Sequence, residues 1–209
     1  MTGRIVLWKV LLPAALLGLA MPARWIDPPA AWGAEEEVYV RSEEAPRLLF
    51  PEATSVEKRV ISLTPAFRAA MEKIVAPTQP SLWEATIPVY EVSAGGAIVG
   101  YAVVVNEIGK HRPITFVVGV TPDVKVKGVE IMIYREPKGG EVRMKGFLKQ
   151  YRGKDLAEPI LTGRDITNIS GATLSVRAVN RGTKKALAIV QLVYGPPRTA
   201  QAPDGTGIR

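Results

Sequence analysis

Four apolar segments follow one another between residues 85 and 134, and they limit the fold more than any other feature of the sequence. They cover residues 85–92, 97–106, 114–120 and 124–134, with turn-forming residues between them. Apolar and polar residues alternate in the first and last of them, whereas residues 97–106 form one long apolar segment; both patterns are typical of strands. Strands joined in sequence order by short turns pair antiparallel. The sequence therefore predicts a mostly antiparallel sheet with one face free for helices.

The last of these segments makes a specific prediction about side-chain orientation. Because side chains alternate along a strand, its residues divide between two faces of the sheet. One face is expected to carry Val129, Ile131 and Ile133, and the other Glu130, Met132 and Tyr134.

Helices are expected before and after the strand region. Thr64 and Pro65 open the first, because threonine caps a helix and proline fits its first turn. Its apolar positions are Phe67, Met71 and Ile74. The second follows a polar turn, carries Val176, Val179, Ala186, Val190 and Val193 at helical spacing, and stops at Gly195-Pro196-Pro197. Together these patterns predict an α+β fold with helices packed on the sheet.

The two ends of the chain differ from this central region. Residues 1–34 carry Arg4 and Lys9 before or within an apolar run, which is typical of a signal peptide; an uncleaved N-terminal anchor is the alternative. Residues 35–82 are interpreted as an N-terminal arm with a helix, and a short helix is also expected near Val56. Residues 196–209 are predicted to form a disordered tail.

The composition excludes several kinds of chemistry. Without cysteine the chain has no disulfide, no thiolate nucleophile and no cysteine-held metal cluster. With one histidine, it has neither a multi-histidine metal site nor an obvious His-based triad. That residue, His111, lies in a basic loop between strands, and a surface position is preferred to a role as a proton carrier. We therefore expect no metal and no catalytic residue, and any redox chemistry requires an organic cofactor.

A polar turn, Ser170-Gly171-Ala172-Thr173, immediately precedes the second helix. Gly171 allows close approach of a ligand to the backbone, and two hydroxyl groups lie beside the free N–H groups of a helix start. The positive end of the helix dipole favours an anion there. The turn is therefore suited to a phosphate, either bound or esterified, although an ordinary capped helix start would carry the same residues.

Ser170-Gly171-Ala172-Thr173, followed by Leu174-Ser175, resembles the flavinylation motif of the covalent FMN-binding domain family. That family includes the C subunit of the sodium-translocating NADH:quinone oxidoreductase and the G subunit of the Rnf complex. The resemblance implies that Thr173 carries FMN through a phosphoester, with Ser170, Gly171, Ala172, Leu174 and Ser175 around it. In the family a flavin transferase that uses FAD attaches the cofactor outside the cytoplasm. The chain departs from the pattern at Thr167, where the family usually has aspartate.

A second segment, residues 134–141, ends a predicted strand with a glycine-bearing loop. The family has a Glu-containing, Gly-rich loop near its flavin, so the resemblance implies that Glu136, Gly139 and Gly140 contact the cofactor; an ordinary loop is the alternative. The pairs Phe147-Leu148, Gln150-Tyr151 and Gly153-Lys154 then resemble the run that precedes the flavinylation motif. The resemblance therefore assigns residues 83–195 to the FMN-binding domain.

What this resemblance implies is an electron-transfer flavoprotein with covalent FMN, rather than a self-sufficient oxidoreductase. It would be exported to the periplasm or the extracytoplasmic face of the cytoplasmic membrane. Its partners would be a flavin transferase and membrane or periplasmic redox proteins. A noncatalytic FMN- or anion-binding module, sensory or interacting, is the alternative function.

The charge distribution fits the same interpretation. The net charge is +7, and residues 135–185 contain twelve basic and five acidic residues. An exported chain without a base-reading motif is not expected to bind nucleic acid. A basic surface instead suits a phosphate-bearing cofactor, an acidic partner or anionic lipid headgroups, and the last of these would allow membrane association.

Overall fold

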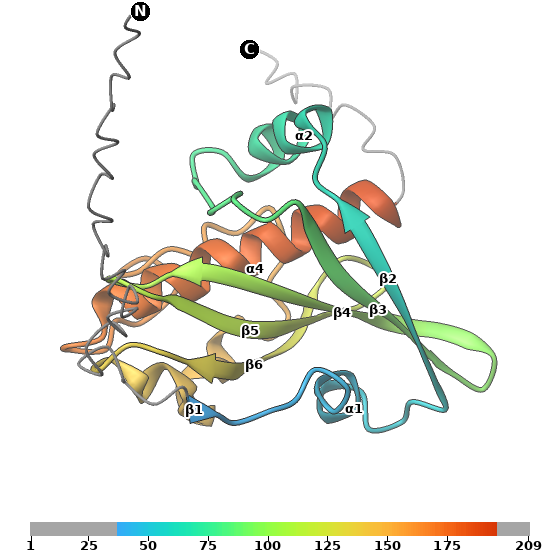
Figure 1. Cartoon of the computed structure of the whole chain (residues 1–209), viewed down its shortest axis with the longest axis horizontal. Coiled ribbons are helices and arrows are strands. Elements are labelled where there is room, and N and C mark those ends of the chain that lie inside the picture. Colours follow the sequence, from blue (N-terminus) through green and yellow to red (C-terminus); the bar gives the residue numbers. More distant parts are fainter. Residues whose placement is uncertain (1–36, 196–209) are drawn as a thin grey trace, which may run out of the picture. The chain divides into compact units, whose positions relative to one another are not determined.

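Six strands form one sheet in the computed structural model, which describes residues 37–195 (Figure 1). They are β1 (Glu37–Val38), β2 (Ser55–Ser62), β3 (Thr86–Ala94), β4 (Ala97–Ile108), β5 (Pro113–Val120) and β6 (Val126–Tyr134). Their order across the sheet is β1-β6-β5-β4-β3-β2, and all neighbours are antiparallel. The four predicted strands correspond to β3, β4, β5 and β6 with every end within two residues, so the expected sheet is confirmed.

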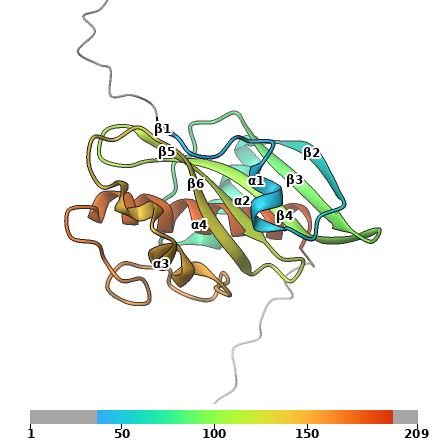
Figure 2. The ribbon, with the colours of Figure 1, turned by 90° about the horizontal axis from the view of Figure 1, so that it is seen from below.

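Helices cover both faces of this sheet. They are α1 (Ala45–Leu49), α2 (Pro65–Val75), α3 (Lys145–Leu148) and α4 (Thr173–Val193), with short 3₁₀ turns η2 (Gly140–Arg143) and η3 (Lys149–Tyr151). α4 packs across β4 and β5, α2 packs on α4, and α1 lies on the opposite face (Figure 1). α3 lies next to β6, near the N-terminal part of α4 (Figure 2). The predicted α+β fold is therefore confirmed.

The central strands contribute side chains to a hydrophobic core on each face. Val103 and Val105 of β4 belong to the core beneath α4, whereas Ala102 and Val104 belong to the smaller core beneath α1. Burial on both faces explains why β4 has a nearly continuous apolar sequence.

The two long helices are found where the sequence predicts them. Thr64 Oγ1 accepts a hydrogen bond from the Phe67 N–H at 3.2 Å and caps α2, whose first residue is Pro65. α4 begins at Thr173 and ends at Val193. Val193 was expected on the apolar face, but its side chain is 37% exposed, and the neighbouring Leu192 and Tyr194 pack against the core instead.

The prediction of a short helix near Val56 was wrong. Val56 belongs to β2 and pairs with Val92 of β3. β2 is an edge strand with most of its residues exposed, and its charged run Glu57-Lys58-Arg59 hides the alternation expected of a strand. Residues 37–62 thus supply both edge strands of the sheet, β1 and β2.

A β-bulge in β6 changes which face Tyr134 occupies. Phe116 pairs with Ile131 and Thr115 pairs with Ile133, so Met132 is an extra residue in β6. Met132 packs in the core beneath α1, whereas Tyr134 packs in the core beneath α4. The expectation that these two side chains share a face was therefore wrong, because strict alternation fails at a bulge.

The predicted signal peptide or anchor and the predicted C-terminal tail lie outside the described residues. Within residues 37–195, no helix has both the length and the apolar character needed to cross a membrane. The same part of the chain contains no group of three or more metal-ligating side chains.

Candidate functional site

The predicted phosphate site lies where α4 begins. Thr173 is the first residue of this 21-residue helix, and no side chain caps the N-terminus. The preceding residue, Ala172, is buried, and Gly171 adopts φ +83°, a left-handed conformation that suits glycine. The N–H groups of the first helical turn have no acceptor inside the helix, and the helix dipole adds positive potential. This end of α4 therefore attracts an anion.

The Thr173 side chain is half-buried in a pocket of about 440 Å³, which we call the motif pocket. Asn168 donates a hydrogen bond from Nδ2 to Thr173 Oγ1 at 2.9 Å. Residues 77–79, before β3, and residues 160–164 form much of the wall. No histidine or carboxylate lines this pocket, so the chain places no general base beside the hydroxyl.

Three arginines line the motif pocket together with Thr173. Arg181 is bound to Glu107, with Nε 3.2 Å from a carboxylate oxygen. Arg164 and Arg177 are exposed, and within residues 37–195 neither forms an ion pair. Arg177 lies four residues after Thr173, and therefore on the same side of α4. Two guanidinium groups consequently remain able to bind an anion held at Thr173.

The wall that faces Thr173 includes a strained residue. Ile160 is buried and has φ +47°, a conformation that β-branched residues rarely adopt. The Asp165 carboxylate accepts the N–H groups of Ile160 and Leu161 at 3.0 and 2.8 Å, and the Lys154 ammonium lies 2.9 Å from it. Burial raises the pKa of Asp165, but these three donors lower it further than burial raises it, so the net pKa lies below its usual value. Asp165 therefore fixes the loop conformation as an ionised group.

The residues before this loop also hold it in place. Gln150 accepts a hydrogen bond from the Thr167 N–H at 2.8 Å. The Tyr151 hydroxyl is hydrogen-bonded to the Asn180 side-chain amide at 2.6 Å, and Asn180 also contacts Thr162. The Gln150-Tyr151 pair that resembles the family thus connects η3 to α4 and to the loop around Thr173.

The glycine loop lies against the other side of the helix start. Gly139 has φ +90°, and a Cβ atom there would lie 2.7 Å from Ser175 Oγ and 2.8 Å from Tyr134 Oη. Only glycine therefore allows the loop to approach Ala172 and Ser175 this closely. The Tyr134 hydroxyl donates to the Lys138 carbonyl oxygen at 2.6 Å and lies 2.9 Å from Ser175 Oγ.

A second pocket, of about 700 Å³, lies along this loop, and we call it the glycine-loop pocket. Gly139, Gly140 and Gly171 line it together, so two parts of the predicted site meet there. Its larger walls come from Tyr39, Tyr134, Arg143 and Met144. The Arg143 guanidinium lies 4.9 Å from the centre of the Tyr39 ring. Planar and apolar surfaces in this pocket suit an aromatic ligand.

Five of the nine predicted site residues line neither pocket: Ser170, Ala172, Leu174, Ser175 and Glu136. Glu136 is buried, and its carboxylate accepts the N–H groups of His111 and Arg112 at 2.5 and 2.9 Å. Burial raises the pKa of Glu136, but the backbone donors of the 110–112 loop outweigh it and lower the net pKa. Ser175 is buried against Tyr134, and Leu174 is 42% exposed. His111 is exposed, as expected.

Several residues of the site were not identified from the sequence. Arg177 has a signal, its four-residue spacing from Thr173 on a predicted helix. Asn168 and Arg164 lie in an irregular loop without such a pattern. Tyr39 follows β1, about a hundred residues earlier, and only the completed sheet brings it to the glycine loop.

Comparison with known proteins finds an FMN-binding domain in part of the chain. Residues 109–188 match the family model described as the FMN-binding domain, and this segment contains all nine predicted site residues. No curated protein was found to match the chain. The matched segment includes α4 as far as residue 188, the glycine loop and most of the residues that line the two pockets. This match supports assignment of the segment to the FMN-binding domain family and supports FMN as its ligand.

Proposed function

We propose that FMN is esterified through its phosphate to Thr173, and that the protein is an extracytoplasmic electron-transfer flavoprotein. The observation that carries the proposal is the position of Thr173, a half-buried hydroxyl at the first residue of α4, in a pocket with two arginines that form no ion pair among the described residues. Bound FMN accepts and releases one or two electrons, which the protein side chains cannot do.

The motif pocket fits the phosphate end of the cofactor. A phosphodiester on Thr173 keeps one negative charge, and the N–H groups of Thr173, Leu174 and Ser175 lie at the positive end of α4. Arg177 and Arg164 supply charge-assisted donors from the helix and from the loop. Asn168 holds the threonine hydroxyl from the other side. These groups stabilise the charge without using a metal.

The glycine-loop pocket fits the ring end. Gly171 lies in its wall two residues before Thr173, so a group that begins at Thr173 can pass the glycine and reach this pocket. Tyr39 and Met144 offer apolar and polarisable surface, and Arg143 offers a cation beside it. Gly139 and Gly140 present backbone groups, as expected for residues that contact the cofactor. Glu136 positions the strand end before this loop through its bonds to residues 111 and 112, and its contact with the cofactor stays a prediction.

Attachment requires a second protein. Thr173 has neither histidine nor carboxylate beside it, and an unactivated hydroxyl is a weak nucleophile. A flavin transferase would supply the base. The Thr173 Oγ1–phosphorus bond forms, the bond from that phosphorus to the AMP portion of FAD breaks, AMP leaves, and the threonine proton passes to the transferase. Covalent attachment keeps the flavin on an exported protein in a compartment where FMN is not resupplied.

The alternative function is a module that binds FMN or another anion without transferring electrons. The uncapped helix end and the arginines would serve such a module equally well. The two functions differ in whether Thr173 acquires a covalent group, and this difference can be measured directly.

The test is production of the full-length chain with and without a flavin transferase, followed by intact mass spectrometry and in-gel fluorescence after denaturation. We expect a mass gain of one FMN less one water in the wild type, and no gain in Thr173→Val. Thr86→Val is the matched control, because it makes the same change at an exposed threonine that lines neither pocket. An unmodified wild-type chain that still binds FMN reversibly would favour the alternative module.

A further inference from the structure

One section of the β6 edge has no strand beside it. On that side β1 pairs only with Ile133 and Tyr134. At the other end, the Val126 N–H donates to the Lys154 carbonyl oxygen, and the Gly153 N–H donates to the Val126 carbonyl oxygen. Between these points no strand of the described chain pairs with residues 127–131 on the β1 side, but the Lys127 carbonyl oxygen accepts a hydrogen bond from Arg152 Nε at 3.2 Å. The open section is therefore residues 128–131, about 10 Å long at the usual rise per strand residue, enough for three or four residues of another chain.

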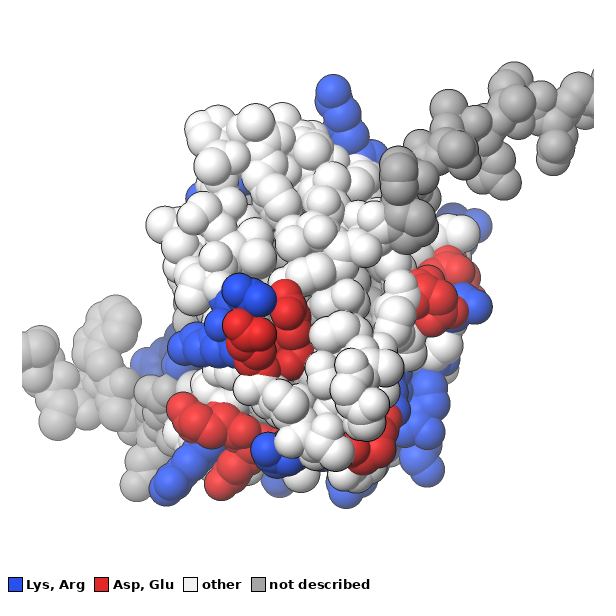
Figure 3. Space-filling view, turned by 90° about the vertical axis from the view of Figure 1, so that its right-hand side faces the viewer, with Lys and Arg blue, Asp and Glu red and all other residues white. Residues whose placement is uncertain are grey.

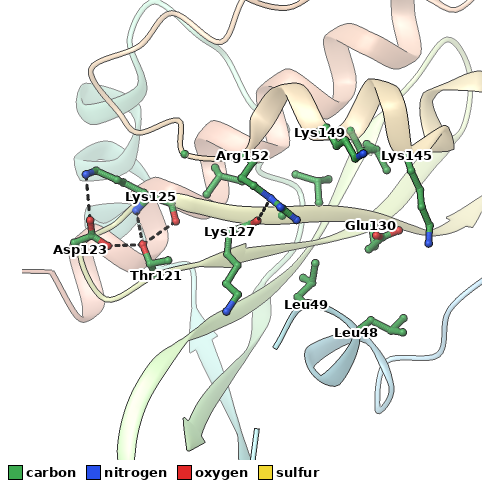
Figure 4. Close-up of a pocket in the computed structure, with 15 residues that line it drawn as sticks. Leu48, Leu49, Thr121, Asp123, Lys125, Lys127, Glu130, Lys145, Lys149 and Arg152 are labelled. Atoms are coloured by element: carbon green, nitrogen blue, oxygen red, sulfur yellow. Dashed lines mark hydrogen bonds and ion pairs between the residues drawn. The ribbon is translucent and has the colours of Figure 1, made fainter. Parts of the chain in front are cut away.

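A groove of about 600 Å³ lies along this open edge (Figure 4). Leu48 and Leu49 of α1 line one side, and Leu148 of α3 lines the other. Figure 4 shows α1 and the α3 segment on opposite sides of β6, so that the strand edge lies between them. Leu48 is 57% exposed and adds apolar surface to the groove. We call this feature the basic groove, for the charges described next.

Five basic side chains surround the basic groove: Lys125, Lys127, Lys145, Lys149 and Arg152. The acidic residues in its lining are Asp123 and Glu130. Lys125 pairs with Asp123 at 3.2 Å, and Lys127 pairs with Glu52. Lys145 acts electrostatically on Glu130, but neither Lys145 nor Lys149 forms an ion pair within residues 37–195. The groove therefore keeps an excess of positive charge.

Other parts of the surface differ from this groove. On the face shown in Figure 3, lysines and arginines lie beside acidic residues in mixed groups, and much of the upper surface is uncharged. The positive charge of the basic groove coincides with an apolar surface and with the open edge of a strand.

We propose that an extended acidic segment of a redox partner protein docks in the basic groove and adds a strand to the open edge of β6. Open backbone groups bind a polypeptide by strand addition, and Lys145 and Lys149 select acidic side chains on it. A flat lipid surface would not reach a strand edge at the bottom of a concave groove. The inference rests on the proposed electron-transfer function, because it names the docking surface for that function.

The position of the basic groove fits this role. Met144 lines the glycine-loop pocket, and the next residue, Lys145, lines the basic groove. Consecutive Cα atoms are about 3.8 Å apart, so the two cavities lie on either side of one short segment. A partner docked in the groove would therefore lie beside the pocket proposed for the flavin ring.

The test measures binding of a fluorescein-labelled eight-residue peptide of alternating Glu and Val to the full-length chain at low ionic strength. We expect the peptide to bind and its Gln-for-Glu version to bind at least tenfold more weakly. Lys145→Glu/Lys149→Glu should weaken binding of the acidic peptide at least tenfold. Lys58→Glu/Lys73→Glu changes the net charge equally at exposed lysines outside the groove and should change it less than threefold. Amide NMR signals of residues 128–131 should shift on binding.

Two kinds of result would overturn the proposal. The first is no binding of the acidic peptide, or equal weakening by both double variants. The second is binding of phosphatidylglycerol vesicles that Lys145→Glu/Lys149→Glu reduces while the peptide does not bind, which would assign the groove to lipid. The measurement is repeated on Thr173→Val, which carries no flavin in the proposed scheme. Peptide binding without any flavin attachment to the wild type would refute the proposed function and leave the docking site standing.

Discussion

The Tyr134 hydroxyl lies 2.9 Å from Ser175 Oγ and joins the end of β6 to the first turn of α4. This contact is possible because the bulge at Met132 places the Tyr134 side chain on the face of the sheet that α4 covers. The same hydroxyl donates to the Lys138 carbonyl oxygen and so fixes the start of the glycine loop. One side chain thus holds the two parts of the flavin site together.

Removing that hydroxyl should loosen the site. Tyr134→Phe leaves Ser175 Oγ, which is buried, without its tyrosine partner and the Lys138 carbonyl oxygen without its donor. We expect the free energy of unfolding to fall by about 1–3 kcal/mol, measured by urea denaturation. Ser170→Ala, which alters an exposed hydroxyl, should change it by less than about 0.5 kcal/mol. Equal stability of Tyr134→Phe and the wild type would show that the hydroxyl is unimportant.

Gly139→Ala should be more damaging than an equivalent change elsewhere. Gly139 and Gly153 both have positive φ, +90° and +79°, but only at Gly139 would a Cβ meet other atoms, 2.7 Å from Ser175 Oγ. Gly153→Ala therefore measures the backbone strain alone, about 1 kcal/mol. We expect Gly139→Ala to cost at least about 1 kcal/mol more, because steric overlap is added. Thermal unfolding of the two variants makes the comparison, and equal losses would mean that the loop moves aside freely.

Arg177→Gln should impair flavin attachment without affecting folding. Arg177 is exposed and forms no ion pair in the described chain, so its loss should shift stability by less than about 0.5 kcal/mol. A charge-assisted hydrogen bond to the phosphate is worth about 1.5–3 kcal/mol, so the initial rate of flavin incorporation should fall about tenfold or more. In-gel fluorescence at early times measures that rate. Lys58→Gln is the control, because it removes one charge on β2, at the opposite edge of the sheet from β1 and β6. Flavin incorporation into this variant should proceed at the wild-type rate.

The loop around Thr173 should become less stable in acid. Because the pKa of Asp165 is lowered in the folded protein, its stabilising effect is complete above the unfolded value near 4 and is lost as the pH falls through the lower folded value. Asp165→Asn should therefore reduce stability at pH 7 by about 2–3 kcal/mol. The difference from the wild type should shrink steadily below pH 4. A constant difference between pH 7 and pH 3 in urea denaturation would contradict the assigned ionisation.

The buried parts of the fold could be predicted from the sequence, and the edges could not. β3 to β6 have apolar residues that the core requires, so their pattern is visible. β2 has one side of its backbone and most of its side chains in solvent, so its charged residues resemble those of a loop or helix. Tyr134 was assigned to the wrong face because a bulge shifts alternation by one residue without leaving a mark in the composition.

The candidate site divides in the same way. Gly171 and Thr173 could be selected from the sequence because a turn and a helix start favour glycine and hydroxyl residues, whereas Gly139 and Gly140 were selected through the resemblance to the family. Asn168 and Tyr39 reach the site only through the folded chain, and their positions follow from tertiary contacts that the sequence does not display. Glu136 was expected to contact the cofactor, a prediction that stands untested, while its visible partners are the backbone groups of residues 111 and 112.

Residues 37–62 supply both edge strands of the sheet, and this has a practical consequence when the protein is shortened. A fragment cut to the boundaries of the family match would begin after β4 and lose four of the six strands. Even a fragment that begins at residue 83 would lack β1 and β2 and would therefore expose the edges of β6 and β3. Two unpaired strand edges on one small domain favour edge-to-edge association between molecules. Shortened versions should therefore aggregate under conditions in which the longer chain does not.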